Sequence, residues 1–492
     1  MTGIAGIILF KKVADAEGIV GCMSNAIKHR GVESLHQFGS KDSIPRALIS
    51  VRTWERDAID IDSGPDYLHI VDSYPHSTKA IKTESFGNST TFKTMTIKID
   101  SDRVRLFRSA DGICGLYYTQ IDSAFIFSSE KKSIWAISRN QIHSLNPGHT
   151  LSITWDGKQE MIQSRGLTQP TIDRSIDEPT AIRILMEPLE AIFNRLAAVQ
   201  KCAVLFSGGV DSALAALLTK KHCKDTLLIT ASFNDSYDEK AAVRAAELID
   251  SKNIVVKIDQ EALWNALPEV IYSIETSERM QVEIALPFFF AARVAKERGV
   301  NLLVSGQGPD DLFAGYARHE RLMKDLGVAA VEDALWKDVS MTHEMNIQRD
   351  VRAIAVHSLD VFFPYMYPPF IKAAMSLPAT LKIDLHSTPS RKIIFRELAR
   401  HLGVPREITI AQKKATQYSS GSTKLLKATI LEKLGEVENT SKRDTPSLVQ
   451  DVLDTIAAHL LMPVARKRGV TQLDLKPTKR LMKRVGLSAS SN

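Results

Sequence analysis

The stretch CAVLFSGGVDSALAALL, residues 202–218, reads as a buried strand, a glycine turn and the start of a helix. Apolar residues 203–206 predict a strand leaving a sheet, and the serine and two glycines that follow predict a tight turn. We expect Asp211 and Ser212 to open a helix at Ala213. The backbone N–H groups of such a turn and the positive end of the helix dipole favour phosphate binding.

Asp211 points to a metal at this turn, because its carboxylate would repel a bare phosphate but can hold Mg²⁺ bound to one. An ordinary turn capped by Asp211 and Ser212 is the alternative for a lone glycine pair. The six residues SGGVDS at 207–212 resemble the pyrophosphate-binding loop of the PP-loop ATP pyrophosphatases, which cleave ATP between its α- and β-phosphates. No GxxxxGKS or GxxxxGKT segment occurs, so Walker-type chemistry has no support.

A second glycine turn has the same layout. Residues 301–304 predict a strand, and SGQGPDDLFAGY at 305–316 follows, with its proline placed for the first helical position and its aspartates for the first turn. If both turns lie at the carboxyl ends of neighbouring parallel strands, Asp211 and Asp310 face one crevice and can share Mg²⁺ on ATP. The alternative is that these aspartates only complement helix dipoles.

With these two turns the chain resembles the asparagine synthetase family and its β-lactam synthetase relatives over roughly residues 180–430. The further motifs of this resemblance are YSIET at 272–276, NIQRD at 346–350, FFPYM at 362–366 and KKATQYSSG at 413–421. The order of the motifs matches the family as well as their identity.

The amino terminus resembles the glutaminase half of the same family, an N-terminal-nucleophile fold of two stacked sheets. The matching segments are MTGIAGI at 1–7, HRGVES at 29–34, RSADGICGLYY at 108–118, FSSEKKSI at 127–134 and LNPGH at 145–149. The family begins MCGI, whereas Thr2 stands here, and its NGE segment is missing from residues 50–105. A threonine can act through its own α-amine, but its hydroxyl is a poor nucleophile, so we expect a structural or regulatory domain.

The predicted fold is therefore α/β. It combines an N-terminal Ntn-hydrolase-like αββα domain with a C-terminal doubly wound PP-loop ATP pyrophosphatase domain of the adenine nucleotide α-hydrolase-like kind. Residues 165–180 are polar, carry two prolines and lack apolar periodicity, which predicts a linker. The predicted units are residues 1–164, the linker 165–180, the synthetase-like domain 181–435, and a helical extension with a basic tail at 436–492.

The resemblance implies ATP and Mg²⁺, with pyrophosphate on the first turn, adenosine at the strand ends and the metal on Asp211 and Asp310. The residues it implies for the nucleotide are Leu205, Ser207, Gly208, Gly209, Val210, Asp211, Ser212, Ser232, Phe233, Ser305 and Gly306. Lys413 or Lys414 would neutralise developing charge, and we favour Lys414 because it lies nearer Tyr418. A lysine pair on a polar loop is otherwise a solvated charge.

The implied reaction is adenylation of a carboxylate, with aspartate as the first choice, followed by amide formation with ammonia to give asparagine and AMP. Three positions depart from the family. Gln307 stands for a glutamate that could accept a proton, Tyr367 for the aspartate of PFLD, and Phe362 for an arginine. A ligase with another acceptor, as in β-lactam synthetases, and a catalytically silent scaffold therefore stay open. A tRNA-modifying PP-loop enzyme should lack the later motifs and carry a basic body.

Composition agrees with a cytoplasmic enzyme, and the small-molecule partners, a carboxylate and ammonia, are implied by the resemblance. The chain has 492 residues, 44% of them hydrophobic, and no apolar run of membrane-spanning length. Its four cysteines show no CxxC spacing, so a reducing compartment is expected. The net charge of +6 is concentrated in residues 463–492, which hold eight lysines and arginines against one aspartate. We interpret this tail as solvated, expect no nucleic-acid partner, and leave a homodimer open.

Overall fold

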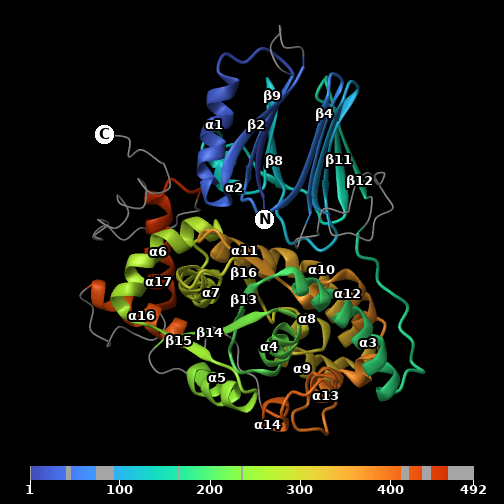
Figure 1. The fold of residues 1–492 in the computed structure, drawn as a ribbon. Helices are drawn as coiled ribbons and strands as arrows, with labels where there is room; N and C mark the ends of the chain where they lie inside the picture. The colour runs from blue at the N-terminus through green and yellow to red at the C-terminus, as the bar shows by residue number, and fades with distance from the viewer. Residues whose placement is uncertain are drawn as a thin grey trace.

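The computed structural model describes residues 2–39, 46–73, 93–163, 166–233, 237–411, 420–434 and 445–463. Figure 1 shows a stack of two β-sheets above a second region in which helices surround a parallel sheet. Both sheets of the stack are antiparallel and six-stranded, in the orders β10-β8-β9-β1-β3-β2 and β12-β11-β7-β6-β5-β4.

The elements of the stack all precede residue 164. The first sheet contains β1 (Gly3–Leu9), β2 (Val32–Phe38), β3 (Ala47–Thr53), β8 (Tyr117–Ile121), β9 (Ala124–Ser128) and β10 (His143–Ser144). The second contains β4 (Ala58–Gly64), β5 (Tyr67–Ser73), β6 (Lys93–Asp100), β7 (Arg103–Arg108), β11 (His149–Thr154) and β12 (Gln159–Gln163). The helical segments are α1 (Ala16–Ala26), η1 (Lys28–Arg30) and α2 (Lys131–Trp135).

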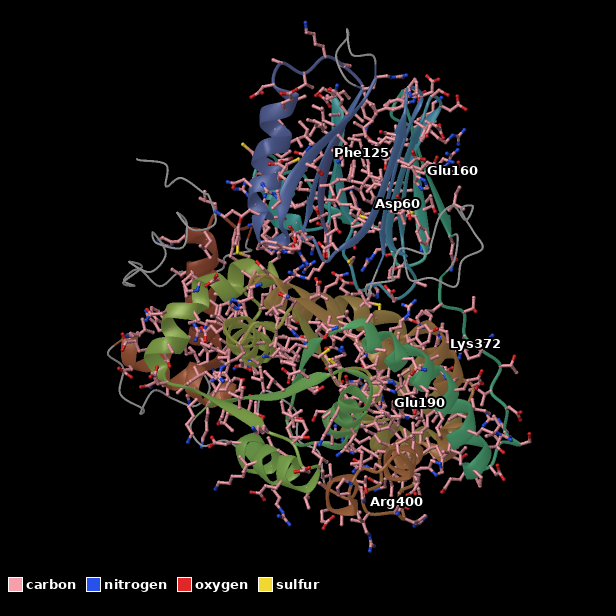
Figure 2. All side chains as sticks on the ribbon, viewed as in Figure 1. Asp60, Phe125, Glu160, Glu190, Lys372 and Arg400 are labelled. Carbon is pink, nitrogen blue, oxygen red and sulfur yellow. The ribbon has the colours of Figure 1, made fainter. Side chains whose placement is uncertain are left out.

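Strand β1 shows how the layers form. All seven of its residues are buried, and they alternate between two cores. Ile4 and Ile8 face the core between the sheets, where Figure 2 labels Phe125, while Ala5 and Ile7 face the core beneath α1. A strand buried on both faces needs apolar residues at every position, which GIAGIIL supplies. The predicted stack of two sheets is confirmed, and helices α1 and α2 both cover its first sheet.

The second region is built on a five-stranded parallel sheet in the order β15-β14-β13-β16-β17. Its strands are β13 (Lys201–Leu205), β14 (Asp225–Phe233), β15 (Asn253–Ile258), β16 (Leu302–Val304) and β17 (Asp360–Phe362). After β13 the chain adds β14 and β15 on one side of β13, and it then adds β16 and β17 on the opposite side of β13. The strand order therefore reverses at the carboxyl ends of β13 and β16, a place that we call the crevice because doubly wound sheets bind ligands in one there. The predicted doubly wound parallel sheet is confirmed.

Helices occupy most of the rest of this region. They are α3 (Glu178–Phe193), α4 (Val210–His222), α5 (Tyr237–Leu248), α6 (Gln260–Ile274), α7 (Arg279–Glu297), α8 (Pro309–Leu312), α9 (Ala317–Leu326), α10 (Val328–Thr342), α11 (Gln348–Ala355), α12 (Pro368–Met375), α13 (Ile393–His401), α14 (Arg406–Thr409), α16 (Ser422–Lys433) and α17 (Thr445–His459). Shorter helical turns are η2 (Asn194–Ala198), η3 (His343–Ile347), η4 (Pro364–Met366) and η5 (Ala379–Leu381).

The start of α4 differs in detail from the sequence prediction. The predicted helix start at Ala213 is wrong, because Gly209 takes the extended conformation of an N-cap and α4 already begins at Val210. Asp211 and Ser212 therefore lie inside the first turn. Helix α17 lies within the predicted helical extension, and its apolar face belongs to the core of the parallel-sheet region, against α6 and α7. The basic tail beyond Pro463 lies outside the described residues.

Candidate functional site

The first glycine turn joins β13 to α4 and is folded on itself. Ser212 Oγ accepts a hydrogen bond from the backbone of Ser207 at 3.3 Å and donates one to the carbonyl of Gly209 at 3.1 Å. Gly208 has a φ of 76°, and a Cβ there would lie 2.5 Å from the backbone of Ala241 in α5. Only glycine fits that position. The Cα of Gly209 is open, since a Cβ there would meet nothing nearer than 3.6 Å.

The second glycine turn lies directly beside the first. It follows β16, which pairs in parallel with β13. A Cβ on Gly306 would approach the backbone of Asp211 and Ser212 to 3.0 Å, so the two turns are in contact. The backbone of Ser305 donates to the carbonyl of Phe362 at 2.9 Å, which fixes the turn to β17. Both turns thus lie at one edge of the sheet, as the sequence predicts.

A buried lysine joins the two turns. Lys392 Nζ lies 2.8 and 2.6 Å from the two carboxylate oxygens of Asp211, and 2.8 Å from Asp310 Oδ1. The lysine side chain is 1% exposed. A Cβ on Gly315 would lie 1.9 Å from Asp310 Oδ1 and 2.5 Å from Lys392 Cε, so glycine is required where these side chains pass. The two aspartates predicted to hold a metal thus converge on one point, where the ammonium lies.

Lys392 was not singled out in the sequence. It lies 181 residues from Asp211 and precedes α13, with a left-handed φ of 60°. Arg396, one turn later, donates to the carbonyls of Arg391 and Ala411 at 2.9 and 3.0 Å. In the sequence, Lys392 and Arg396 are only two basic residues one turn apart at the start of a helix. This pattern is a weak indication of a functional site, since charged residues of this spacing are common on solvated helices.

Neighbouring side chains hold the two turns in place. Tyr365 donates its hydroxyl proton to the carbonyl of Asp211 at 2.9 Å. The carboxylate of Asp311 accepts from Tyr316 at 2.9 Å and from Thr342 at 3.1 Å. Burial, and then the negative charge of Asp310, raise the pKa of Asp311 to about 7. Asp311 therefore supports the second turn, while Asp310 points to the lysine.

The residues proposed to border adenosine lie at the ends of β13 and β14. Leu205 ends β13, and Ser232 and Phe233 end β14. The Ser232 hydroxyl donates to Glu239 of α5 at 2.6 Å. The backbone of Phe233 donates to the carbonyl of Ser420 at 3.1 Å, and a Cβ on Gly421 would lie 2.4 Å from the carbonyl of Phe233.

Ser420 and Gly421 are the described end of the predicted lysine-bearing loop, and they join it to the strand ends of the crevice. Lys413, Lys414 and Tyr418 themselves lie outside the described residues.

Comparison with known proteins agrees with this geometry. The family model of asparagine synthase matches residues 189–330 and 323–455, more than half of the chain and both glycine turns. The chain belongs to the asparagine synthase family. The match does not extend to the stack of sheets, which precedes residue 164.

Individual relatives are distant. The protein named asparagine synthetase (glutamine-hydrolyzing) 1 of Methanocaldococcus jannaschii is 27% identical over 367 residues, which cover 66% of this chain and 68% of that protein. The asparagine synthetase (glutamine-hydrolyzing) of Brassica oleracea is 25% identical over 64% of this chain, which spans only 55% of the plant protein. Among solved structures, NMN synthetase from Francisella tularensis aligns with 14% identity over 60% of this chain and 100% of that one, at a TM-score of 0.26.

Because relatives are named glutamine-hydrolyzing, the environment of Thr2, which directly precedes β1, is relevant. Thr2 is 1% exposed, and its hydroxyl donates to Asp72 Oδ1 at 2.8 Å. The cavity beside it has a volume of about 10 Å³ and is lined in part by Arg30, Cys114 and Arg352. Such a cavity holds one water molecule and is too small for glutamine. The family's NGE segment is absent from the sequence, and residues 74–92 lie outside the described part of the chain.

The family motif at 272–276, together with Arg352 just after the motif at 346–350, contributes to the interface between the two regions. Glu275 accepts from the backbone of Lys132 at 2.8 Å and lies 3.2 Å from Arg352 Nε. On the other side, Glu130 accepts from Arg30 at 2.6 Å and pairs with Lys132. Although burial acts to raise it, these cations hold the pKa of Glu130 well below its usual range. This buried network, defined here as Arg30, Glu130, Lys132, Glu275 and Arg352, fastens the stack to the parallel-sheet region.

The positions that depart from the family are partly explained by packing. Phe362, in place of an arginine, is fully buried and contacts Phe193 edge to face, with ring centroids 5.9 Å apart. Tyr367 caps α12. Gln307 is half-buried between the two glycines of the second turn, and its backbone donates to Ser305 Oγ at 3.3 Å. No described helix is long and apolar enough to span a membrane.

Proposed function

We propose that this chain is an ATP-dependent amide ligase that adenylates a carboxylate, with aspartate as the first candidate, and transfers the acyl group to ammonia. One observation carries the proposal. Two glycine turns, two carboxylates and a lysine converge where the strand order of the parallel sheet reverses, the place where such folds bind nucleotides. Family membership and the ATP-cleaving loop class agree with this.

The residues present fit Mg²⁺ that arrives with nucleotide. Asp211 and Asp310 direct oxygen atoms at one point, and hard oxygen ligands are what Mg²⁺ prefers. Within the described residues no group of three or more His, Cys, Asp or Glu side chains could hold a metal ion. Mg²⁺ is usually bound by one or two carboxylates plus substrate phosphates. When bound, the metal would withdraw charge from the leaving pyrophosphate.

The chain's own groups account for the first half-reaction. Backbone N–H groups of residues 207–212 and the N-terminus of α4 hold the pyrophosphate. The Lys392 ammonium and, on its loop, Lys414 or Lys413 oppose the negative charge that develops on it. A substrate carboxylate oxygen attacks the α-phosphorus while the bond to pyrophosphate breaks, which leaves an acyl-adenylate. Leu205, Ser232 and Phe233 border the adenosine.

In the second half-reaction, ammonia attacks the activated carbonyl carbon, the bond to AMP breaks and an amide forms. The attacking nitrogen must lose a proton, and Gln307 cannot accept it. Solvent is then the proton acceptor. We propose ammonia as the nitrogen donor because Thr2 is held by Asp72 and its cavity cannot admit glutamine.

A ligase of the same kind with a different acceptor is the second candidate. It is favoured by Phe362, which removes a cation that would pair with the carboxylate of a free amino acid, and by Gln307. Exchange of labelled pyrophosphate into ATP, measured with each candidate carboxylic acid, separates the candidates. Exchange with aspartate supports asparagine synthesis, exchange with another acid names that acid, and no exchange with any acid would overturn a ligase function.

A further inference from the structure

Lys392 lies where a cation is needed to hold two buried carboxylates together. Its ammonium is within 2.6 to 2.8 Å of three oxygen atoms of Asp211 and Asp310. The side chains of the two aspartates are only 12% and 15% exposed. Carboxylates buried this far repel one another strongly unless a positive charge compensates them. In this structure that charge belongs to the chain itself.

The lysine is held in this position by its surroundings. Its backbone N–H donates to the carbonyl of Phe313 at 3.2 Å, and its φ of 60° is left-handed. Gly315 leaves just enough room for Lys392 Cε, since a Cβ there would lie 2.5 Å from it. The ammonium is thus fixed on the carboxylates by packing along its aliphatic stem as well as by charge.

A divalent cation and this ammonium compete for the same oxygens. Mg²⁺ binds carboxylate oxygens at about 2.0–2.1 Å, so it would have to occupy nearly the point where Nζ now lies. Two positive charges at that separation repel each other, and two carboxylates alone cannot neutralise both. The Lys392 ammonium can move away from the carboxylates only if another anion binds it. The pyrophosphate part of a nucleotide bound at residues 207–212 would be such an anion.

We propose that Lys392 is an internal cation that closes the Asp211–Asp310 pair to free Mg²⁺, so that the metal enters only together with nucleotide phosphates. The inference rests on the proposed function, in which this pair holds the metal. It makes Lys392 a positioning residue for metal entry, in addition to any contact that it makes with the leaving pyrophosphate.

The test is binding of Mn²⁺, a paramagnetic substitute for Mg²⁺, to the full chain without nucleotide, followed by electron paramagnetic resonance. Lys392→Met should bind Mn²⁺ about tenfold or more tightly than wild type, because removal of the ammonium removes the competing charge. Lys392→Arg keeps a cation and should bind as weakly as wild type. Lys372→Met, an exposed lysine on α12 that Figure 2 labels, is the matched control and should change nothing.

Equal Mn²⁺ affinity in wild type and Lys392→Met would overturn the inference. If Lys392→Met does not fold, the inference is tested by comparing Mn²⁺ binding of nucleotide-free wild type with that of Asp310→Asn. Mn²⁺ binding to nucleotide-free wild type that Asp310→Asn removes would overturn the inference, and its absence supports it. Pyrophosphate exchange by wild type is a separate readout. Tight Mn²⁺ binding by Lys392→Met in a chain that exchanges no pyrophosphate would sustain the role of Lys392 while the proposed function fails.

Discussion

The crevice at the parallel sheet and the pocket of Thr2 both contain polar groups typical of a catalytic site, but they use them differently. At the crevice, two carboxylates meet a lysine that a nucleotide phosphate could receive as an alternative anion, and the Cα of Gly209 is open. At Thr2, the hydroxyl is paired with a buried carboxylate beside a cavity of about 10 Å³. Polar side chains whose hydrogen bonds are all made inside a closed pocket stabilise the fold. Polar side chains that can exchange a protein partner for a ligand can bind a substrate.

Removal of either crevice carboxylate should have the largest effect on turnover. Asp211→Asn and Asp310→Asn each take a charge from the proposed metal site, which costs several kcal/mol of transition-state stabilisation, so pyrophosphate exchange should fall below detection. The fold should survive, because Lys392 keeps the other aspartate as a partner. Circular dichroism and exchange assays measure the two effects.

Asp225→Asn is the control for these variants. Asp225 starts β14, at the opposite end of the sheet, and forms an exposed pair with Lys201 at 3.5 Å. It should retain full exchange. Retained exchange in Asp211→Asn or Asp310→Asn would instead show that the aspartate concerned is only part of a helix start, and would remove the contrast between the two regions.

Gln307→Glu should raise the rate of amide formation near neutral pH if the chain makes asparagine. A positioned general base contributes roughly 10²–10⁴-fold at most. The wild-type rate should depend on free NH₃ and climb with pH toward the ionisation of ammonium, while the variant should level off earlier. A pH–rate profile of both proteins with aspartate and ammonia measures this.

Lower activity in Gln307→Glu would indicate a different amine or acid, because the new carboxylate would then lie in the pocket without a partner. No turnover of aspartate by either protein would remove asparagine synthesis and leave a carboxylate-adenylating enzyme with another acceptor.

Glu130→Gln should change stability much more than turnover. It leaves Arg30 buried without its anion and Lys132 with only the more distant Glu275, at 3.9 Å, and breaking a buried pair costs about 3–5 kcal/mol. Thermal unfolding should shift down clearly, while exchange at a temperature where the variant is folded stays near wild type. Glu160→Gln, on exposed strand β12, should shift neither.

The pH dependence of wild-type stability has a defined sign. Because the folded-state pKa of Glu130 is lowered, its contribution is fully present above the pKa of the unfolded chain and is lost as pH falls through and below that value. Glu130→Gln should therefore lose less stability than wild type between neutral and acid pH. An equal acid-induced loss in both proteins would show that the ionised carboxylate of Glu130 does not stabilise the folded chain.

Thr2→Cys should have the smallest effect. Although it restores the family's nucleophile, glutamate release from glutamine should stay at background, because the cavity remains too small for glutamine. Ammonia-dependent AMP formation should be unchanged. Glutamate release by wild type at a rate matching AMP formation would show that the Thr2 pocket is a working site after all.

Local patterns made the two glycine turns predictable. An apolar strand followed by SGGVDS, or by SGQGPDD, carries its own geometry, and parallel strands place both turns at one edge. The start of α4 was misplaced because the Gly209 cap can be recognised only from its backbone angles. Thr2 was recognised as a changed nucleophile, but its partner Asp72 lies 70 residues further along the chain.

Long-range side-chain contacts were beyond the reach of the sequence. Lys392 meets Asp211 across 181 residues, and no local pattern announces that contact. Glu275 belongs to a recognisable motif, yet its place at the interface between the two regions depends on how α2 packs against the end of α6. Packing of this kind is decided by the whole fold rather than by neighbouring residues.

The order of strands in the parallel sheet also bears on how the site forms during folding. Cys202 of β13 pairs with Leu302 of β16, about a hundred residues later, with β14, β15, α6 and α7 in between. Contacts between residues this distant in sequence form late, because the entropy of closing the intervening chain must be met first. The first glycine turn can form early, whereas the second joins it only when the sheet is nearly complete. Chains trapped on the folding pathway would therefore possess half of the nucleotide site and none of its paired carboxylates.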